Sequence, residues 1–135
     1  MPGGKVSGKA AVITINSQNL SSDSLTYTIN YAVDTHDVTG FGDGSHNFIA
    51  GMPIRDMDIS FLYDSTSTTG SFTVMQAAVQ AAVPITCSIV PEVGGKTYSG
   101  SFLPVGITVS GDTSSPIKLG TVKFLPGSST APSWA

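Results

Sequence analysis

Charged side chains are scarce in this sequence. Asp, Glu, Lys and Arg make up 11% of the 135 residues, less than half of the roughly 25% found in typical globular domains. A small protein that stays monomeric normally carries more surface charge, which keeps its copies apart in solution. Together with many Ser, Thr and Gly residues, this shortage indicates a surface that is covered by partner molecules.

The sequence also lacks a cluster of basic residues. Its six Lys and Arg residues occur singly along the chain, and the formal net charge is −3. Proteins that bind nucleic acid through a basic patch gather cations on one face, because phosphate neutralisation supplies most of their affinity. The scattered cations argue against that mode of binding.

Cysteine is nearly absent, and long apolar runs are absent. The single cysteine, Cys87, has no partner for an intrachain disulfide, and it alternates with Ile85 and Ile89, which predicts a small core residue. The first nine residues lack the apolar stretch of a signal peptide, and no run reaches the ~18 residues of a membrane helix. We therefore expect no membrane partner, and a protein that is used in a cytosol-like compartment or leaves it without a cleaved signal.

Alternation of apolar and polar residues predicts a mainly β fold. Leu25–Val33 is the clearest strand, and period two places its five apolar side chains in the core. Ile54–Tyr63 alternates again, with apolar residues on one face and Asp56 and Asp58 on the other. Shorter β-rich runs cover residues 10–15, 85–90, 97–103, 105–109 and 117–125.

One helix is predicted, at about residues 71–83, ended by Pro84. Its packing stripe is expected to contain Phe72, Met75, Val79, Ala82 and Val83. We expect a domain over residues 10–125, with a flexible N-terminal arm at 1–9 and a C-terminal tail at 126–135. Trp134 in that tail is expected either to anchor to a neighbour or to be exposed. The predicted fold class is a β-sandwich or barrel with one flanking helix.

The most polar stretch is Asp34–Asp64, predicted as strand, glycine-rich turn, strand, proline turn and strand. It contains both histidines, six of the nine acidic residues and the only arginine. A metal site would draw on four residues of this stretch, but their spacing matches neither a closed zinc pattern nor a calcium loop: His36, Asp37, Asp43 and His46.

A catalytic site is not supported by the residue pattern either. No G-x-S-x-G nucleophile motif occurs. Asp56 and Asp58 are side by side, as acid–base carboxylates can be, but they lie on the polar face of their strand. Gly40–Gly44 leads into a strand and not a helix, so it lacks phosphate-loop geometry. Its glycines instead predict positive φ in a tight or bulged turn, with Asp43-Gly44 as the hairpin signal. We predict no catalytic residue, no metal and no cofactor.

Three motifs in this stretch resemble tail tube proteins of long-tailed bacteriophages. They are Asp37–Gly44 (DVTGFGDG), Phe48–Met52 (FIAGM) and Phe61–Asp64 (FLYD). The resemblance is dense over residues 25–64 and architectural over 65–125. It implies a structural virion protein that forms hexameric rings, which stack into a tube through which DNA leaves. Strands of the six subunits would join in one inner β-barrel. Assembly would take place in the host cytoplasm, with tape-measure, tail-tip or terminator proteins as further partners.

Site predictions follow from the resemblance and from the strand faces. Asp56 and Asp58 are expected to face the lumen, where six copies of a chain with net charge −3 would carry about −18 per ring and repel DNA within a Debye length of ~8–10 Å. We expect contacts between subunits or rings at the turn residues Thr39, Phe41, Asp43 and His46, and through Trp134. The alternatives are a ring-forming tail terminator or head–tail connector, a monomeric ligand-binding β-sandwich, and a hydrolase using Asp56 and Asp58.

Overall fold

The computed structural model describes residues 11–92 and 94–135, so the flexible N-terminal segment predicted at 1–9 lies outside the described residues. One helix and several strands follow each other along the chain: β1 (Val12–Ile15), β2 (Gln18–Asn19), β3 (Ser24–Asp37), β4 (Phe48–Leu62), α1 (Ser71–Ala81), β5 (Ile85–Val90), β6 (Tyr98–Pro104), β7 (Val109–Ser110), β8 (Lys118–Pro126) and β9 (Ser133–Trp134). The predicted mainly β fold with one helix is confirmed.

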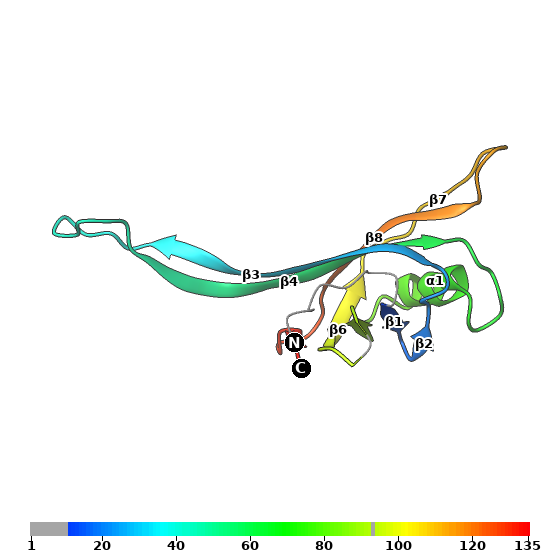
Figure 1. Ribbon diagram of the computed structural model, residues 1–135, viewed down its shortest axis with the longest axis horizontal. Coiled ribbons are helices and arrows are strands. Elements are labelled where there is room, and N and C mark those ends of the chain that lie inside the picture. The colour runs from blue at the N-terminus through cyan, green and yellow to red at the C-terminus, as the bar shows by residue number, and fades with distance from the viewer. Residues whose placement is uncertain (1–10, 93) are drawn as a thin grey trace.

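The described strands form one antiparallel sheet in the order β2-β1-β5-β6-β8-β4-β3, with β7 paired to β8 and β9 to β6. The sheet is open, since β2 and β3 end the order without pairing to each other. Figure 1 shows that it doubles back on itself: β3, β4 and β8 form one layer, and β1, β2 and β6 lie across from it beside α1. The core fills the space between these two layers.

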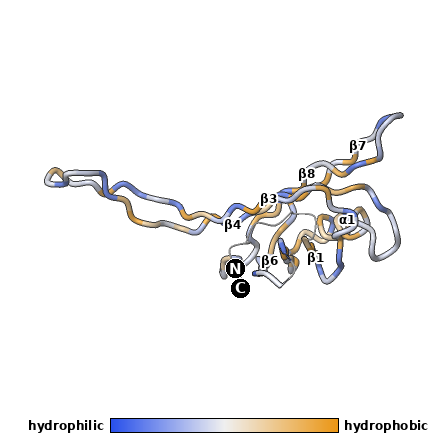
Figure 2. Tube along the Cα trace, viewed as in Figure 1, coloured by the Kyte–Doolittle hydropathy of each residue, from blue (hydrophilic) through white to orange (hydrophobic). Residues whose placement is uncertain are grey.

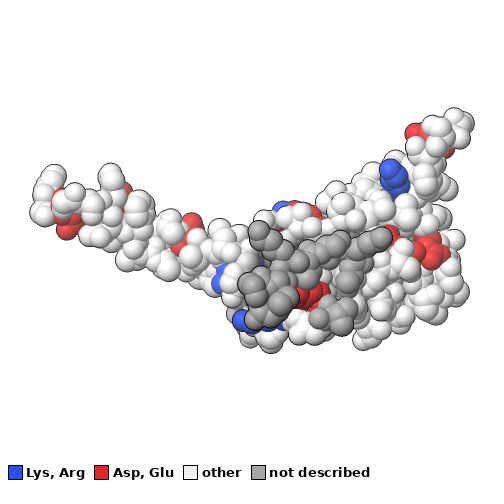
Figure 3. Space-filling view, viewed as in Figure 1, with Lys and Arg blue, Asp and Glu red and all other residues white. Residues whose placement is uncertain are grey.

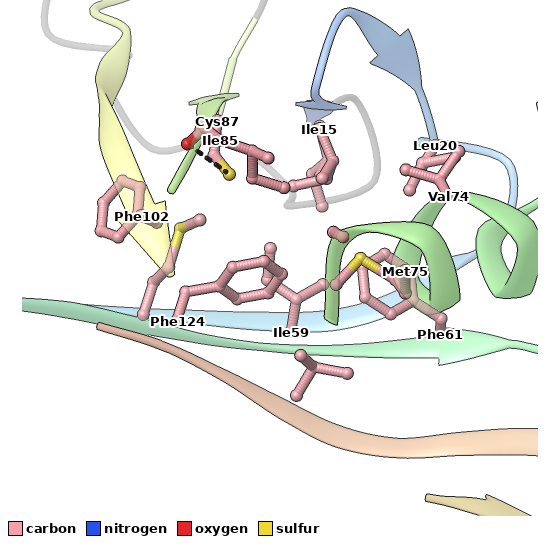
Figure 4. Packing of buried hydrophobic residues seen from close by; sticks show 14 of the residues in the cluster. Ile15, Leu20, Ile59, Phe61, Val74, Met75, Ile85, Cys87, Phe102 and Phe124 are labelled. Carbon is pink, nitrogen blue, oxygen red and sulfur yellow. Dashed lines mark hydrogen bonds between the residues drawn. The ribbon is translucent and has the colours of Figure 1, made fainter. Parts of the chain in front are cut away.

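The core draws side chains from both layers and from α1 (Figure 4). From β4 it takes Met57, Ile59 and Phe61, all fully buried, so the two-faced strand predicted at Ile54–Tyr63 is confirmed for its central residues. Cys87 is also fully buried, and burial raises the pKa of its thiol to about 12. Its predicted place in the core is therefore confirmed.

The helix is shorter than predicted, and its buried face differs in part from the predicted stripe. It ends at Ala81 because Ala82 takes a left-handed conformation with φ 55°, and Pro84 follows. Its buried residues follow the i, i+3, i+4, i+7 spacing of a packing face: Ser71, Val74, Met75 and Ala78. The predicted stripe was correct for Met75 and for Phe72, which packs against the core while partly buried; Val79 is partly buried, and Ala82 and Val83 are exposed. Among the described residues, no helix is long and apolar enough to cross a membrane.

Hydrogen bonds tie the start of α1 to the loops around it. Asp23 Oδ2 accepts a bond from the Ser71 N–H at 3.3 Å, and the Ser71 hydroxyl donates to the carbonyl of Leu62. Asp64 lies beside Asp23. Burial raises the pKa of Asp23, and the neighbouring Asp64 carboxylate raises it further. This corner therefore holds two carboxylates close together at the N-terminus of α1.

The hairpin of β3 and β4 extends far beyond the body (Figure 1). β8 pairs with β4 between Met57 and Leu62, and farther out β3 and β4 pair only with each other. We call residues 31–55, the part of the hairpin beyond the sheet, the arm. Pro53 lies inside β4, so the predicted proline turn is wrong. A proline is tolerated there because β4 has a free edge in the arm and a register shift follows between Val33 and Thr35.

The arm also overturns one burial prediction. The apolar set of Leu25–Val33 was expected in the core, but Leu25, Tyr31 and Val33 are exposed, and Tyr27 and Ile29 are partly buried. The alternation itself is present. A register shift displaces Leu25, and beyond Ile29 the described residues cover this face only in part: Tyr31 contacts Tyr98 of β6, whereas Val33 is exposed.

The C-terminal tail is attached to the body. β9 pairs with β6, and the backbones of Thr97 and Ala135 exchange two hydrogen bonds of 2.9 Å. The Trp134 ring lies 5.1 Å from the Tyr98 ring and packs against the core. Trp134 was expected on a neighbour or in solvent. Instead it is partly buried on its own subunit, because strand pairing returns the tail to β6.

Candidate assembly surfaces

The turn at the tip of the arm is held by its own side chains. Asp43 Oδ2 accepts from the Gly40 N–H at 2.7 Å and from Asn47 Nδ2 at 3.1 Å, and Thr39 Oγ1 accepts from the Asn47 N–H at 2.8 Å. Asp37 accepts from both the hydroxyl and the N–H of Thr39, and these bonds lower the pKa of its carboxyl. Two predicted contact residues, Thr39 and Asp43, therefore shape the turn.

The other two predicted contact residues are available to a partner. The Phe41 ring is fully exposed at the tip, and the His46 ring is 78% exposed, with Nδ1 3.6 Å from Asp37 Oδ2. The predicted positive φ at the tip glycines is wrong: among the described glycines only Gly94 has positive φ. Side-chain caps, and not left-handed glycines, therefore close this turn.

Apolar side chains lie on both faces of the arm. Residues directly opposite each other on β3 and β4 share a face of the ribbon. Phe48, which pairs with Asp37, lies on the face that continues the core side of the sheet. Ile49 and Ile54 pair with His36 and Ala32 and lie on the opposite, outer face. The exposed large apolar residues of the arm are Tyr31, Val33, Val38, Phe41, Phe48, Ile49, Met52 and Ile54. Figure 2 shows this hydrophobic character along the arm. A lone two-stranded ribbon is marginal in water, and apolar residues on both faces call for cover on both sides.

Gly51 lies close to the exposed His36 side chain on the outer side of the arm. A Cβ on Gly51 would lie 2.7 Å from Nε2 of His36, which in turn is 3.8 Å from Asp34 Oδ2. Within the described part of the chain, no group of three or more His, Cys, Asp or Glu residues is placed to hold a metal ion. The two histidines each pair with one aspartate and lie on different parts of the arm.

Asp56 and Asp58 lie on the outer face of the sheet, opposite the core. Their side chains are 17% and 29% exposed, and Lys123 Nζ on β8 lies 3.5 Å from Asp56 and 3.9 Å from Asp58. Asn30 Nδ2 donates a hydrogen bond to Asp56. A cation therefore sits beside both carboxylates. The trio carries a single net negative charge, so the face is less acidic than the sequence suggested.

A cluster at the root of the arm was missed by the sequence analysis. The guanidinium of Arg55 stacks over the Tyr31 ring, which also contacts Tyr98. Arg55 is the only arginine, which was a signal in the sequence, but its neighbours depend on the register of β3 on β4. In Figure 3 acidic residues appear along the arm, whereas basic residues appear only at its root and on the body.

Comparisons with known proteins place this fold among tail assemblies. No protein-family model matches the sequence, and a search of curated proteins finds no match. A chain from the tail of an empty gene transfer agent particle, refined with C6 symmetry, superposes with a TM-score of 0.73 at 17% identity, over 97% of this chain and 99% of that chain.

Two chains from an extracellular contractile injection system, PVC, are also similar. One, from the sheath-tube complex in the extended state, has a TM-score of 0.70 at 11% identity and covers 99% of this chain and 92% of that chain. The other, from the sheath/tube terminator, has a TM-score of 0.70 at 12% identity, and the match covers 100% of this chain and 99% of that chain. The predicted tail-tube fold is confirmed over nearly the whole chain.

Proposed function

We propose that this chain is a structural subunit of a phage-type tail tube, in which six copies form a ring and rings stack into a conduit for DNA. The observation that carries the proposal is the arm. It projects from a fold shared with a chain of a C6-symmetric tail, and both its faces carry apolar side chains that no other described residue fully covers. Neighbouring copies, within a ring and between rings, would bury these faces.

The outer face of β3, β4 and β8 suits the wall of such a conduit. Beside β8 it presents Thr28, Asn30 and Thr121 with the trio of Asp56, Asp58 and Lys123. A wall that is polar and close to neutral would neither bind phosphate strongly nor repel it strongly. DNA would slide past without specific contacts. In this role the subunit needs no catalytic residue and no cofactor, and its place is the virion after assembly in the host cytoplasm.

Thiol labelling tests the direction of this face. Thr28 is exposed on it, and the native Cys87 is fully buried with a raised pKa, so a Thr28→Cys variant would carry the one reactive thiol of the described chain. In assembled tubes we expect a small maleimide to react and a bulky polymer maleimide to be excluded, whereas both should react with free subunits. Equal reaction of the bulky reagent in tubes would place the face outside, and no reaction with either would place it in an interface.

Negative-stain electron microscopy of the concentrated protein tests the function itself. Stacked tubes are the expected result, and tape-measure and tail-tip or terminator proteins would set their length. Single rings that never stack would favour the tail terminator or head–tail connector, a candidate supported by the match to the sheath/tube terminator chain. A protein that stays monomeric at all concentrations would overturn both proposals.

A further inference from the structure

A second hairpin, residues 109–118, projects from the body at the end opposite the arm (Figure 1). It joins β7 to β8, and Ser110 pairs with Lys118 at its base. β4 connects the two projections. Its last residue, Leu62, pairs with Lys118, and its first residue, Phe48, lies beside the tip of the arm. This strand of 15 residues spans ~50 Å at ~3.3 Å per residue. The tip of an arm therefore cannot reach the second hairpin of its own chain.

The end of the second hairpin carries an open hollow. Its volume is about 200 Å³, and it is lined by Ser110, Gly111, Asp112, Ser115, Pro116 and Lys118. Beside it, Ile117 is 49% exposed. The hollow is smaller than the ~300–1,000 Å³ of a small-molecule site, so a protein side chain suits it better than a cofactor. Its lining combines a cation, hydroxyl groups and apolar contact.

Lys118 is an exposed cation without an acidic partner. The ion pairs among the described residues involve Lys123 and the two histidines, and none includes Lys118. Asp112 also lines the hollow, but its carboxylate already accepts hydrogen bonds from Ser114, and the bond from the Ser114 backbone lowers the pKa of Asp112. Lys118 is therefore free to receive a carboxylate from another molecule.

The tip of the arm carries the matching groups. The arm beyond its root, residues 31–54, contains three aspartates and no Lys or Arg. Phe41 is fully exposed at the tip, and the hydrogen bonds of Asp43 to Gly40 and Asn47 hold the turn that presents it. A turn that is already held by such bonds loses little conformational freedom when it docks. An acid and an aromatic ring at the tip thus face a cation and apolar side chains at the hollow.

We propose that the second hairpin is the docking site for the arm tip of a second copy of this chain. The Asp43 carboxylate pairs with Lys118 in the hollow, and this charge pair fixes the register of the interface. The Phe41 ring packs against Pro116 and Ile117. The contact joins two different surfaces, so every copy keeps one free end and the contact repeats head to tail. The inference rests on the proposed function only in taking stacked copies as neighbours, and it goes further by naming the surface that receives each arm.

Disulfide cross-linking between two variants tests the contact. Gly42→Cys places a thiol at the tip, where a Cβ meets no atom within 4 Å, and Ser110→Cys places one in the hollow. The native Cys87 is fully buried and its pKa is raised to about 12, so it stays unreactive. A disulfide needs Cα atoms within about 7 Å of each other. In assembled mixtures of the two variants under a mild oxidant, we expect cross-linked dimers on non-reducing gels.

The control replaces the Ser110→Cys variant with Ser67→Cys, the same substitution in the exposed loop between β4 and α1. We expect no dimers above background when Gly42→Cys is assembled with this control. Equal cross-linking with the control, or as many dimers from Gly42→Cys alone, would overturn the docking site.

Charge reversal measures the contribution of Lys118. Lys118→Glu should raise the critical concentration for assembly, measured by pelleting, roughly 3- to 10-fold, the range when repulsion replaces a solvent-exposed charge pair. The dilute subunit should melt like the wild type, because Lys118 is exposed and makes no ion pair with another described residue. Lys96→Glu makes the same charge change elsewhere on the surface and should assemble normally. Equal effects of the two variants would contradict the pairing.

These outcomes separate the docking site from the function. Tubes that form without the cross-link and without regard to Lys118 would leave the tail-tube function standing and overturn this inference. Cross-linked chains that never form rings or tubes would do the reverse, and a chain that stays monomeric would overturn both.

Discussion

The two faces of the arm should contribute to assembly and not to the stability of the subunit. Phe48 and Ile49 are neighbours in β4, yet they point to opposite faces and are 60% and 53% exposed. Fully burying such a side chain is worth about 1.5–3 kcal/mol, so burying the exposed half contributes about 0.8–1.5 kcal/mol per contact. Phe48→Ser and Ile49→Ser should each raise the critical concentration for assembly roughly 4- to 12-fold, since about 1.4 kcal/mol is a factor of ten.

The assay is pelleting of assembled protein over a concentration series, with thermal melting of the dilute subunit alongside. Val83→Ser is the control. Val83 follows α1 on the body, and its exposed fraction of 52% is similar to the 53% of Ile49. We expect the control to assemble like the wild type and all three subunits to melt within a few degrees of it. If both arm variants assembled normally, the arm would not be an assembly element. If they melted much earlier, these side chains would stabilise the subunit instead.

Three further predictions concern the subunit alone. Trp134→Ala should lower the free energy of unfolding by about 2 kcal/mol, because the ring packs on Tyr98 and large-to-small core changes cost up to about 3–5 kcal/mol. Urea unfolding followed by circular dichroism measures this change. An unchanged urea midpoint would mean that the tail is not docked on the body. Gly70→Ala should destabilise by more than 1 kcal/mol in the same assay, since a Cβ would lie 2.3 Å from the carbonyl oxygen of Asp64. Asp23→Asn should stabilise the subunit by roughly 0.5 kcal/mol at pH 7, because burial and the neighbouring Asp64 both disfavour the Asp23 carboxylate, a cost on the scale of one exposed charge pair. The pKa of Asp23 in the folded subunit is raised above its usual value of 3.8, so the destabilising carboxylate charge is present above the folded pKa and disappears as the pH falls through it. If Asp23→Asn were still more stable than the wild type at pH 3, the carboxylate charge would not be the cause.

Local patterns in the sequence determined which segments are strands and which single segment is a helix. Period-two alternation located the buried face of β4 and the core position of Cys87 because those signals depend only on neighbouring residues. The Asp43-Gly44 pair predicted the position of the hairpin turn. No residue spacing typical of a nucleophile motif or a metal site occurs, which favoured a role in assembly over catalysis. Even the helix was found with nearly correct ends, since Pro84 limits it.

Tertiary structure alone decided what covers each face. Alternation shows that Leu25–Val33 has an apolar side, but not that the described part of the second layer covers this side only in part and leaves Leu25, Tyr31 and Val33 exposed. Strand register, a long-range property, brought Lys123 between Asp56 and Asp58 and set Arg55 on Tyr31. Pairing of β9 with β6 returned Trp134 to its own core. Sequence periodicity reports the direction of a side chain, whereas burial and charge pairing depend on which distant strand lies opposite it.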